Sequence, residues 1–321
     1  MGLYDENQLR WGLELEITGN TRGSAAKVLQ DFFGVPYVHE GTHYDKYSVT
    51  DRKGRKWVVM SDASIIPLKK VNGAIRSASD LFKDELVSPP LMISDISEYQ
   101  EIIRLLRKAG FFPSETCGVH IHISSQSGLS HKTVINVLNH IHSKQDLLYK
   151  ALGVNTSMSG RYRYCKRIPT ELVENLKKKK PSNLSDIANI WYSTLSNLSE
   201  LRGCRYPSAR YHCINLCRLF PGPYCYHTIE FRCYPSSLHA GKLKSFIQLS
   251  ALIVSHCNEI SKSSYKPTVV GADESEAYKF RCWLLHLGAI GPEFSTLRHH
   301  LLGEHFGTQS KAWRRGDRTS A

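Results

Sequence analysis

Long apolar runs are missing from this 321-residue sequence, which argues against a transmembrane helix. The longest run, around Leu249–Val254, is far shorter than the roughly 20 residues needed to span a bilayer. The first residues, MGLYDENQLRW, lack the basic start and apolar stretch of a signal peptide. Glu6 stands where a myristoylation signal has Ser or Thr. We therefore expect a cytoplasmic protein without a membrane partner.

Several familiar motifs are also missing. The sequence has no Gly-rich phosphate loop of the Walker or dinucleotide type and no G-x-S-x-G elbow. Its nine cysteines are odd in number and lack a paired C-x2-C grid. Cys213 and Cys217, followed by Cys225 and Cys233, come closest to zinc-ligand spacing, so a structural zinc site is the alternative to reduced thiols. We expect reduced thiols, and we find no partner that would make Cys117 a nucleophile.

Apolar content and positive charge are both present. Hydrophobic residues make up 41% of the chain, enough to bury a core, which excludes a disordered protein. Lys and Arg number 42 against 29 Asp and Glu, a net charge of +13. This excess favours a polyanionic partner such as nucleic acid, nucleotide phosphates or an acidic substrate.

Short strands interspersed with helices are predicted by the spacing of apolar residues. The predicted strands are Trp11–Thr18, Lys46–Asp51, Lys56–Ser61, Glu85–Ser88, Thr116–Ser124, Tyr211–Leu219 and His227–Cys233. The predicted helices are 24–33 with Ser24 as N-cap, 95–110 with an Asp95/Glu98 capping box, Ser130–Leu152, Ser185–Leu201, Ser237–Ser261 and two shorter ones near the C-terminus. Strands of alternating polarity among helices predict an α+β fold, an antiparallel sheet with helices on one face.

Two domains are predicted from these patterns. Residues 1–270 are predicted to form the main domain, in which the polar, basic stretch near 153–181 is predicted to be an insertion or mobile loop. Residues 271–321 form a C-terminal helical extension with a polar tail.

The most informative pattern is a pair of polar side chains two residues apart on three predicted strands. The strands are GLELEI with Glu14 and Glu16, GVHIHIS with His120 and His122, and TIEFR with Glu230 and Arg232. Side chains at i and i+2 of a strand project from the same face, so each pair shares a face. The intervening apolar residues face the helices and fix the register, because a slip of one residue would bury the charges.

A divalent metal site explains these pairs better than an ordinary wet sheet face. Adjacent carboxylates raise each other's pKa unless a cation lies between them. Carboxylate oxygens and imidazole nitrogens together suit Mg²⁺ or Mn²⁺, and Mn²⁺ tolerates the imidazole better. Two further segments carry acidic groups, with Asp62 at a strand-to-turn junction and Glu85 at the start of a strand that Pro89 ends. Taken alone, Asp62 could equally form an Asx turn.

The chain resembles the amidoligase family, which is related to glutamine synthetase and glutamate–cysteine ligase. The resemblance rests on the ordered segments WGLELE, SDAS, ELVSPPL, CGVHIHIS, RYHCINL and TIEFR, the last followed by SSLHAGKLKSFIQLSALIV. It covers about Trp11 to Val254, without a counterpart for 153–181 or for the chain after Ser261. It implies a glutamine-synthetase-like fold with a curved, mostly antiparallel sheet.

The resemblance also implies site residues, with ATP and Mg²⁺ or Mn²⁺ as cofactors. The implied metal ligands are Glu14, Glu16, Glu85, His120 and Glu230. The implied nucleotide-binding residues are His122, Ser124, Arg210, Asn215 and Arg232. Two departures from the family pattern matter. Glutamine synthetases carry two carboxylates where this chain has Glu85, so Asp62 or Asp84 would complete the set, and the DGS-like turn is here Asp62-Ala63-Ser64, without its glycine.

The implied reaction joins a carboxylate to an amine. ATP would phosphorylate the carboxylate, and the amine would displace phosphate from the acyl phosphate. The implied catalytic residues are Arg232 and Arg210, which neutralise phosphoryl charge, and Asp62, which takes a proton from the ammonium. The substrates are expected to be small molecules or groups borne on a carrier.

Two other functions fit the same residues. The His/Glu set and the positive charge also suit a metal-dependent nuclease or phosphodiesterase. A non-catalytic nucleic-acid-binding protein would use basic stretches with interleaved aromatics. These stretches are Arg161–Arg167, Lys177–Lys180 and Lys311–Arg318, with Tyr162, Tyr164 and Trp313. His131, His140 and His142 fall on one predicted helix without ligand spacing, and we expect them to be satisfied surface or core residues.

Overall fold

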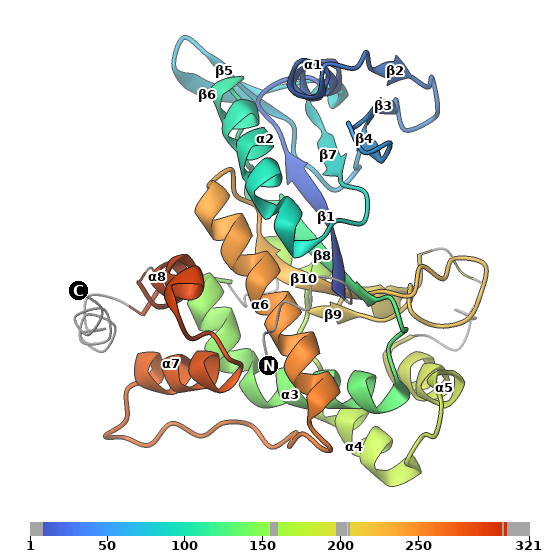
Figure 1. Ribbon diagram of the computed structural model, residues 1–321, viewed down its shortest axis with the longest axis vertical. Coiled ribbons are helices and arrows are strands. Elements are labelled where there is room, and N and C mark those ends of the chain that lie inside the picture. Colours follow the sequence, from blue (N-terminus) through green and yellow to red (C-terminus); the bar gives the residue numbers. More distant parts are fainter. Residues whose placement is uncertain (1–8, 155–159, 197–203, 205, 304, 307–321) are drawn as a thin grey trace.

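An eight-stranded antiparallel sheet lies at the centre of the computed structural model, which describes residues 9–154, 160–196, 204, 206–303 and 305–306 (Figure 1). In spatial order the strands are β2 (Val38–His39), β3 (Tyr47–Thr50), β4 (Lys56–Met60), β7 (Asp84–Val87), β1 (Leu9–Ile17), β8 (Gly118–Ser125), β10 (Ile229–Pro235) and β9 (Ile214–Asn215). All seven pairings between them are antiparallel, so the predicted sheet type is confirmed. A separate hairpin joins β5 (Leu68–Val71) to β6 (Ala74–Ser77).

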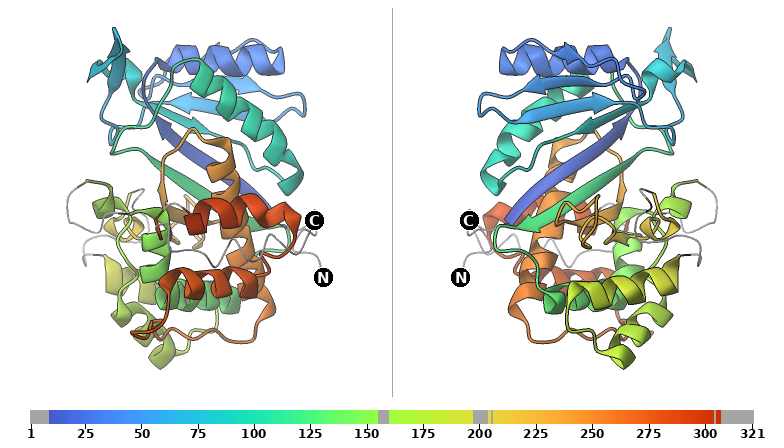
Figure 2. Two further views of the ribbon diagram at one scale, coloured as in Figure 1. Left: turned by 90° about the vertical axis from the view of Figure 1, so that its left-hand side faces the viewer. Right: turned by 90° about the vertical axis from the view of Figure 1, so that its right-hand side faces the viewer.

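Strict alternation along the central strands gives the sheet one apolar and one polar face. On the apolar face, Leu15 of β1, Ile121 of β8 and Phe231 of β10 are all 0% exposed. Four helices pack over this core, namely α1 (Arg22–Phe33), α2 (Ile96–Lys108), α3 (His131–Leu152) and α6 (Ala240–Glu259). The two views of Figure 2 show α1 and α2 on one side of β1 and the strands uncovered on the other. The polar face is therefore free of these helices.

One predicted N-cap is wrong, and one predicted capping box does not form although its helix begins where predicted, after Asp95. Thr21, rather than Ser24, caps α1, and its hydroxyl accepts a hydrogen bond from the backbone N–H of Ser24. The expected capping box of α2 is also absent, because the carboxylate of Asp95 accepts from the Met92 N–H and from Lys53 and Arg55. The carboxylate of Asp95 therefore forms salt bridges with Lys53 and Arg55, in the segment between β3 and β4.

The described residues of the segment 153–181 contain regular elements that the sequence did not predict. They are the 3-10 turn η3 (Gly160–Tyr164) and a helix, α4 (Thr170–Lys179). Leu172, Val173 and Leu176 form the buried stripe of α4, and its last turn carries three lysines, which suit the negative end of a helix. The run of lysines made this stretch look like a polar loop in the sequence, and the helix was therefore not predicted.

Helix α5 (Leu184–Leu195) lies where Ser185–Leu201 was predicted, and α7 (Glu276–His286) and α8 (Ser295–Gly303) are the two short helices predicted near the C-terminus. The short turn η4 (Ser208–Arg210) was not predicted. The predicted strand Tyr211–Leu219 shrinks to the two residues of β9, because the chain turns at residues 217–219 directly after Leu216. Among the described residues, no helix has the length and apolar character needed to cross a membrane.

Candidate functional site

Strand pairing brings the predicted polar side chains into one row on the uncovered face. Glu85 of β7 lies opposite Glu16 of β1, and Glu14 lies opposite His120 of β8. Directly opposed residues of antiparallel strands project from the same face. Farther along the sheet, His122 of β8 lies opposite Glu230 of β10, and Glu230 in turn lies opposite Asn215 of β9. Residues from five adjacent strands therefore meet.

His120 lies at the centre of this row and touches three carboxylates. Its Nδ1 is 3.0 Å from Glu14 Oε2 and 3.8 Å from Glu230 Oε1. Its Nε2 is 3.7 Å from Glu16 Oε1. Glu16 is itself held in place by the backbone N–H of Gly118, which donates to Glu16 Oε2 at 2.6 Å. The central imidazole is thus surrounded by negative charge from β1 and β10.

His122 has one ring nitrogen engaged and one directed at the carboxylates. Nδ1 is 3.2 Å from the hydroxyl of Thr228, while Nε2 is buried, 3.2 Å from Glu14 Oε1, and makes no aligned hydrogen bond within the described chain. Burial lowers the pKa of His122, but the charges of Glu14 and Glu230 outweigh it and raise that pKa. Burial likewise raises the pKa of Glu14, yet His122 and His120 together hold it well below its ordinary value.

Glu230 is fixed by an arginine and an amide. Arg232 donates to Glu230 Oε1, and Asn215 Nδ2 donates to Glu230 Oε2 at 2.6 Å. Although burial raises it, Arg232 and His122 bring the pKa of Glu230 down to about 2. The ladder between β10 and β8 is interrupted after Phe231, where the register shifts between Phe231 and Tyr234 in a β-bulge that contains Arg232. The carboxylate of Glu230 is therefore ionised and oriented.

The opposite corner of the face is purely acidic. Glu16, Asp62 and Glu85 bring one carboxylate oxygen each within 4.8 Å of one another. Burial raises the pKa of Glu85 well above its ordinary value, and the charges of Glu14, Asp62 and Glu16 raise it further. We call Glu16, Asp62 and Glu85 the acidic corner. Its carboxylates repel one another in the absence of a cation.

Three overlapping groups on this face have the spacing of metal ligands. They are Glu14–His122–Glu230, Glu14–Glu85–His120 and Glu16–Asp62–Glu85, each with donor atoms within 4.8 Å of one another. The donors are carboxylate oxygens and imidazole nitrogens, which suit Mg²⁺ or Mn²⁺. His122 Nε2 makes no aligned hydrogen bond although Glu14 Oε1 lies 3.2 Å away, and a bound cation would give it a partner. The same cation would offset the burial and the repulsion that raise the pKa of Glu85. The residues present therefore fit divalent ions.

Three other residues considered for the site belong to none of the three metal-type groups. Ser124 lies on the same face one pair beyond His122. Arg210 lies in η4 with its guanidinium 5.0 Å from the Tyr206 ring, and its charge opposes the rise in the pKa of Glu85. Asp84, the alternative partner for Glu85, projects from the apolar face of β7 and is fully buried. Burial raises the pKa of Asp84 to about 9, so it does not complete the acidic corner, whereas Asp62 does.

Two residues of the site face escaped the prediction. Arg10 and Gly12 continue the alternation of β1 backwards from Glu14, and Arg10 lies opposite Ser124. Gly12 lies opposite His122, and a Cβ added there would lie 3.8 Å from the Cβ of His122. Counting back by two from Glu14 would have identified both positions.

The segment expected to be an insertion supports the site. The carbonyl of Tyr164 accepts a hydrogen bond from Arg232 Nε at 3.3 Å, and Lys166 forms a bridge with His212 just before β9. The ring of Tyr164 packs edge-on against the ring of Tyr211 at 5.5 Å, and the ring of Tyr162 packs on that of Tyr149 at 6.1 Å. Both rings thus make packing contacts within the protein, and nucleic-acid binding by this stretch stays a prediction. The other stretch, Lys311–Arg318 with Trp313, lies outside the described residues.

The cysteines do not form the zinc site considered from their spacing. Cys213 and Cys233 are buried in the core, while Cys217 and Cys225 are partly exposed. Burial raises the pKa of Cys213 to about 12 and that of Cys217 to about 11, so both stay thiols. No cysteine joins a metal-type cluster within the part of the chain that the structure describes.

Comparison with models of protein families gives a match over most of the chain. The family described as "Putative amidoligase enzyme" matches residues 7–254, more than three quarters of the chain, and spans every strand of the site face. The comparison with curated proteins gives no match.

Proposed function

The chain belongs to the putative amidoligase enzyme family, and from this premise we propose that it is an ATP-dependent carboxylate–amine ligase that forms an amide through an acyl phosphate. One observation carries the proposal. Carboxylates and imidazoles from β7, β1, β8 and β10 converge on one uncovered face in three metal-compatible groups. We further propose a glutamine-synthetase-like fold, because the strands bearing Glu14/Glu16, His120/His122 and Glu230/Arg232 are adjacent in the sheet.

The metal ligands in this proposal come from those three groups. They are Glu14, Glu16, Glu85, His120 and Glu230. Asp62 and His122 lie beside these ligands and are given other roles below. Bound Mg²⁺ or Mn²⁺ would supply Lewis-acid stabilisation of the negative charge on the phosphoryl oxygens.

The cationic and hydrogen-bonding end of the face would hold the phosphates. Arg232 is buried, and its charge is fixed by Glu230. His122 and Ser124 project from the same face of β8, and the charge of Arg232 acts on His122. Preorganised donors of this kind favour the charge that spreads over a phosphoryl group during transfer. Arg232 therefore acts as a fixed positive charge, and Asn215 holds its partner Glu230 in position.

The acidic corner would receive the amine. An ammonium group is attracted to the carboxylates of Glu16, Asp62 and Glu85, and it must lose a proton before it attacks an acyl group. Asp62 is the most accessible of the three, since Glu16 and Glu85 are 3% and 4% exposed. We assign Asp62 the role of proton acceptor.

An ADP-release assay with mixtures of acids and amines tests the proposal. The purified chain, ATP and Mg²⁺ are incubated with the mixtures, ADP is measured, and products are sought by mass spectrometry. Glu14→Gln should lower ADP formation by on the order of 10²–10³-fold, because the substitution removes a charge shared by two metal groups.

Glu174→Gln serves as the matched control, since Glu174 is exposed on α4, away from the site face. It should retain full activity. Equal activity in Glu14→Gln and the wild type would contradict the assignment. Cleavage of nucleic acid by metal alone, without ATP consumption, would instead support the nuclease reading.

A further inference from the structure

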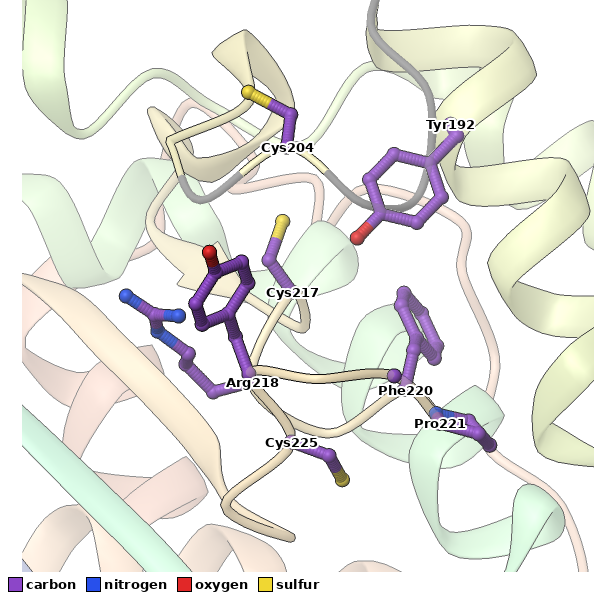
Figure 3. Close-up of a pocket in the computed structure, with 9 residues that line it drawn as sticks. Tyr192, Cys204, Cys217, Arg218, Phe220, Pro221 and Cys225 are labelled. Carbon is purple, nitrogen blue, oxygen red and sulfur yellow. The ribbon is translucent and has the colours of Figure 1, made fainter.

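The hairpin of β5 and β6 forms a two-stranded sheet of its own and projects from the body of the molecule (Figure 1). Every residue from Lys69 to Ser77 is exposed, including Val71 at 42% and Ile75 at 57%. The hollow beside β9, by contrast, has a cavity volume of about 10 Å³, the space of a single water molecule (Figure 3). The hairpin, and not the hollow, therefore offers a surface on which a partner can bind.

A tight turn and a firm base define the backbone of this hairpin. Asn72 and Gly73 have φ of 50° and 80°, the two positive values that a type I′ turn requires. At the base, the Leu68 N–H donates to the Thr18 hydroxyl at 2.8 Å, and the Leu68 carbonyl accepts from the Gly19 N–H at 3.0 Å. These bonds hold β5 against the end of β1 and stabilise a hairpin that would be marginal on its own.

One long edge of the hairpin is occupied and the other is open. A parallel bridge at Lys69 joins the outer edge of β5 to the end of β1, whereas β6 pairs with β5 alone within the described residues. After a two-residue turn, hydrogen-bonded pairs alternate with non-hydrogen-bonded pairs, which places the N–H and C=O of Ile75 and Ser77 on the outer side of β6. The bond from the Ala78 N–H to the Pro67 carbonyl follows the same alternation. We call this row of outward backbone groups the β6 edge.

Positive charge surrounds the β6 edge. Residues 63–79 include no Asp or Glu and three cations, Lys69, Lys70 and Arg76. Lys69 lies opposite Arg76 on one face of the hairpin, and Lys70 projects from the other face. The lysine ammonium groups lie over aromatic rings, 6.0 Å and 5.4 Å from the ring centres, and the described residues give the three cations no carboxylate partner. An added strand that is rich in Asp or Glu complements this charge.

Other occupants fit the charge and the geometry less well. Pairing of two β6 edges would bring like charges from two copies of the chain together, and cations on an edge strand are a common safeguard against such pairing. Val71 shares a face with Lys69 and Arg76, whereas Ile75 shares the other face with Lys70, so the hairpin has no single apolar face to insert into a membrane. Neither β5 nor β6 has an aromatic ring on which a nucleobase could stack.

We propose that the β6 edge binds an extended, acidic segment of a partner protein, which adds a third strand to the hairpin. The N–H and C=O groups of Ile75 and Ser77 pair with the backbone of the added strand, which supplies affinity that does not depend on its sequence. Lys69, Lys70 and Arg76 select for acidic side chains on it. The inference is independent of the proposed ligase reaction, since none of these residues belongs to the site face.

Fluorescence anisotropy of a labelled, end-blocked peptide of alternating Glu and Val, titrated with the full chain, tests the β6 edge. Replacing every Glu by Lys should weaken binding of the peptide by about tenfold or more, because the charges then repel. Ile75→Pro removes one outward N–H and no bond to β5, and should raise the Kd of the acidic peptide by about tenfold. Ile75→Thr keeps that N–H in a β-branched residue and should change the Kd by less than about twofold.

Two further measurements separate charge from strand addition. Arg76→Glu should raise the Kd by about tenfold, whereas Lys178→Glu, the same charge change at an exposed position of α4, should change it by less than about twofold. The acidic peptide should slow hydrogen exchange at the Ile75 and Ser77 amides of the wild type and leave Arg76, whose N–H faces β5, unchanged. This exchange measurement keeps the test decisive if Ile75→Pro distorts the hairpin.

Several outcomes would overturn the proposal. They include a wild type that does not bind the acidic peptide, equal binding of the acidic and basic peptides, and unchanged exchange at Ile75 and Ser77. A dimer of the wild type that Ile75→Pro abolishes would make a second copy the occupant. Binding of single-stranded DNA or anionic vesicles that Arg76→Glu abolishes and Ile75→Pro retains would make the hairpin a general polyanion site. ADP release should be the same in Ile75→Pro and the wild type, so failure of the ligase proposal is detected separately.

Discussion

The tripeptide His-Ile-His occurs twice in this chain, at 120–122 in strand β8 and at 140–142 in helix α3. In β8 the two imidazoles project from one face and meet three carboxylates, from Glu14, Glu16 and Glu230. In α3 consecutive residues are turned by about 100°, so imidazoles two residues apart point in nearly opposite directions. The same three residues therefore form a polar cluster in one place and separate core contacts in the other.

The helical histidines are satisfied by hydrogen bonds to the elements packed around α3. His140 Nε2 accepts a hydrogen bond from Trp283 Nε1 at 2.6 Å, and His142 Nδ1 donates to the Tyr265 carbonyl at 2.6 Å. Burial, with the nearby charges of His256 and Lys144, lowers the pKa of His140 to about 3. His122 shows the reverse, because carboxylates raise its pKa. The comparison teaches that the environment supplied by neighbouring elements, and not the motif, sets the chemistry of each imidazole.

Removing a strand histidine should give the largest effect on activity. His120→Asn takes away the nitrogen that faces Glu16, so ligase turnover should fall by on the order of 10²–10³-fold. The melting temperature should change little, because the residue lies on the polar face outside the apolar core. Steady-state ADP release and a thermal melt measure the two. A large loss of stability at unchanged turnover would make His120 structural like its helical counterpart.

Removing a helical histidine should act on stability alone. His140→Ala leaves the buried Trp283 N–H without its acceptor and creates a cavity, which should cost about 2–4 kcal/mol of unfolding free energy. Turnover of the folded fraction should match the wild type. Urea unfolding followed by fluorescence gives the free energy. Selective loss of turnover at full stability would show that the two motifs share a role.

Lowering the pH should reduce the free energy of unfolding through the helical motif, because His140 is buried in its neutral form. The folded-state pKa of His140 is about 3 against an ordinary value of 6.5, so the unfolded chain takes up the proton first as pH falls. The contribution of His140 to stability is therefore complete above pH 6.5 and is lost from there toward pH 3, by up to about 1.4 kcal/mol per pH unit. Urea unfolding at pH 7, 6 and 5 measures the slope. His140→Gln should flatten it, and an identical slope in that variant would refute this origin.

The central isoleucines should give the smallest effect and behave alike. Ile121 and Ile141 are both 0% exposed, so Ile→Val at either position removes one buried methylene, costing roughly 0.5–1.5 kcal/mol. Neither substitution should affect turnover, since both side chains project into the core. Chemical denaturation of the paired variants compares them. A catalytic defect in Ile121→Val alone would mean that the β8 backbone shifts with its core contact.

Much of the site could be predicted from local pattern. Alternation in GLELEI and GVHIHIS identified which residues share a face, and the Pro-Pro pair placed the end of β7. The same alternation extends back from Glu14 to Arg10, which therefore could also have been predicted. Errors arose where a polar residue had a tertiary partner, as with Asp95, whose carboxylate binds Lys53 and Arg55 instead of capping α2.

What lay beyond prediction depends on contacts between distant segments. Nothing local indicates that β7 lies between β4 and β1, the order that brings Glu85 opposite Glu16 and close to Asp62. The local sequence also does not indicate that Asp84 faces the core while Glu85 faces the site, because this depends on the register of β7. The link from Tyr164 to Arg232 joins segments that no periodicity connects.

The sequence by itself determined the strands, their two faces and the set of acidic and imidazole groups, because side-chain direction alternates with a period of two along any strand. The tertiary structure alone decided which groups become neighbours. Strand order and register follow from the joint burial of apolar faces under α1, α2, α3 and α6 and from hydrogen bonds between segments up to about two hundred residues apart. Those are properties of the whole packed chain, and no short window of residues contains them.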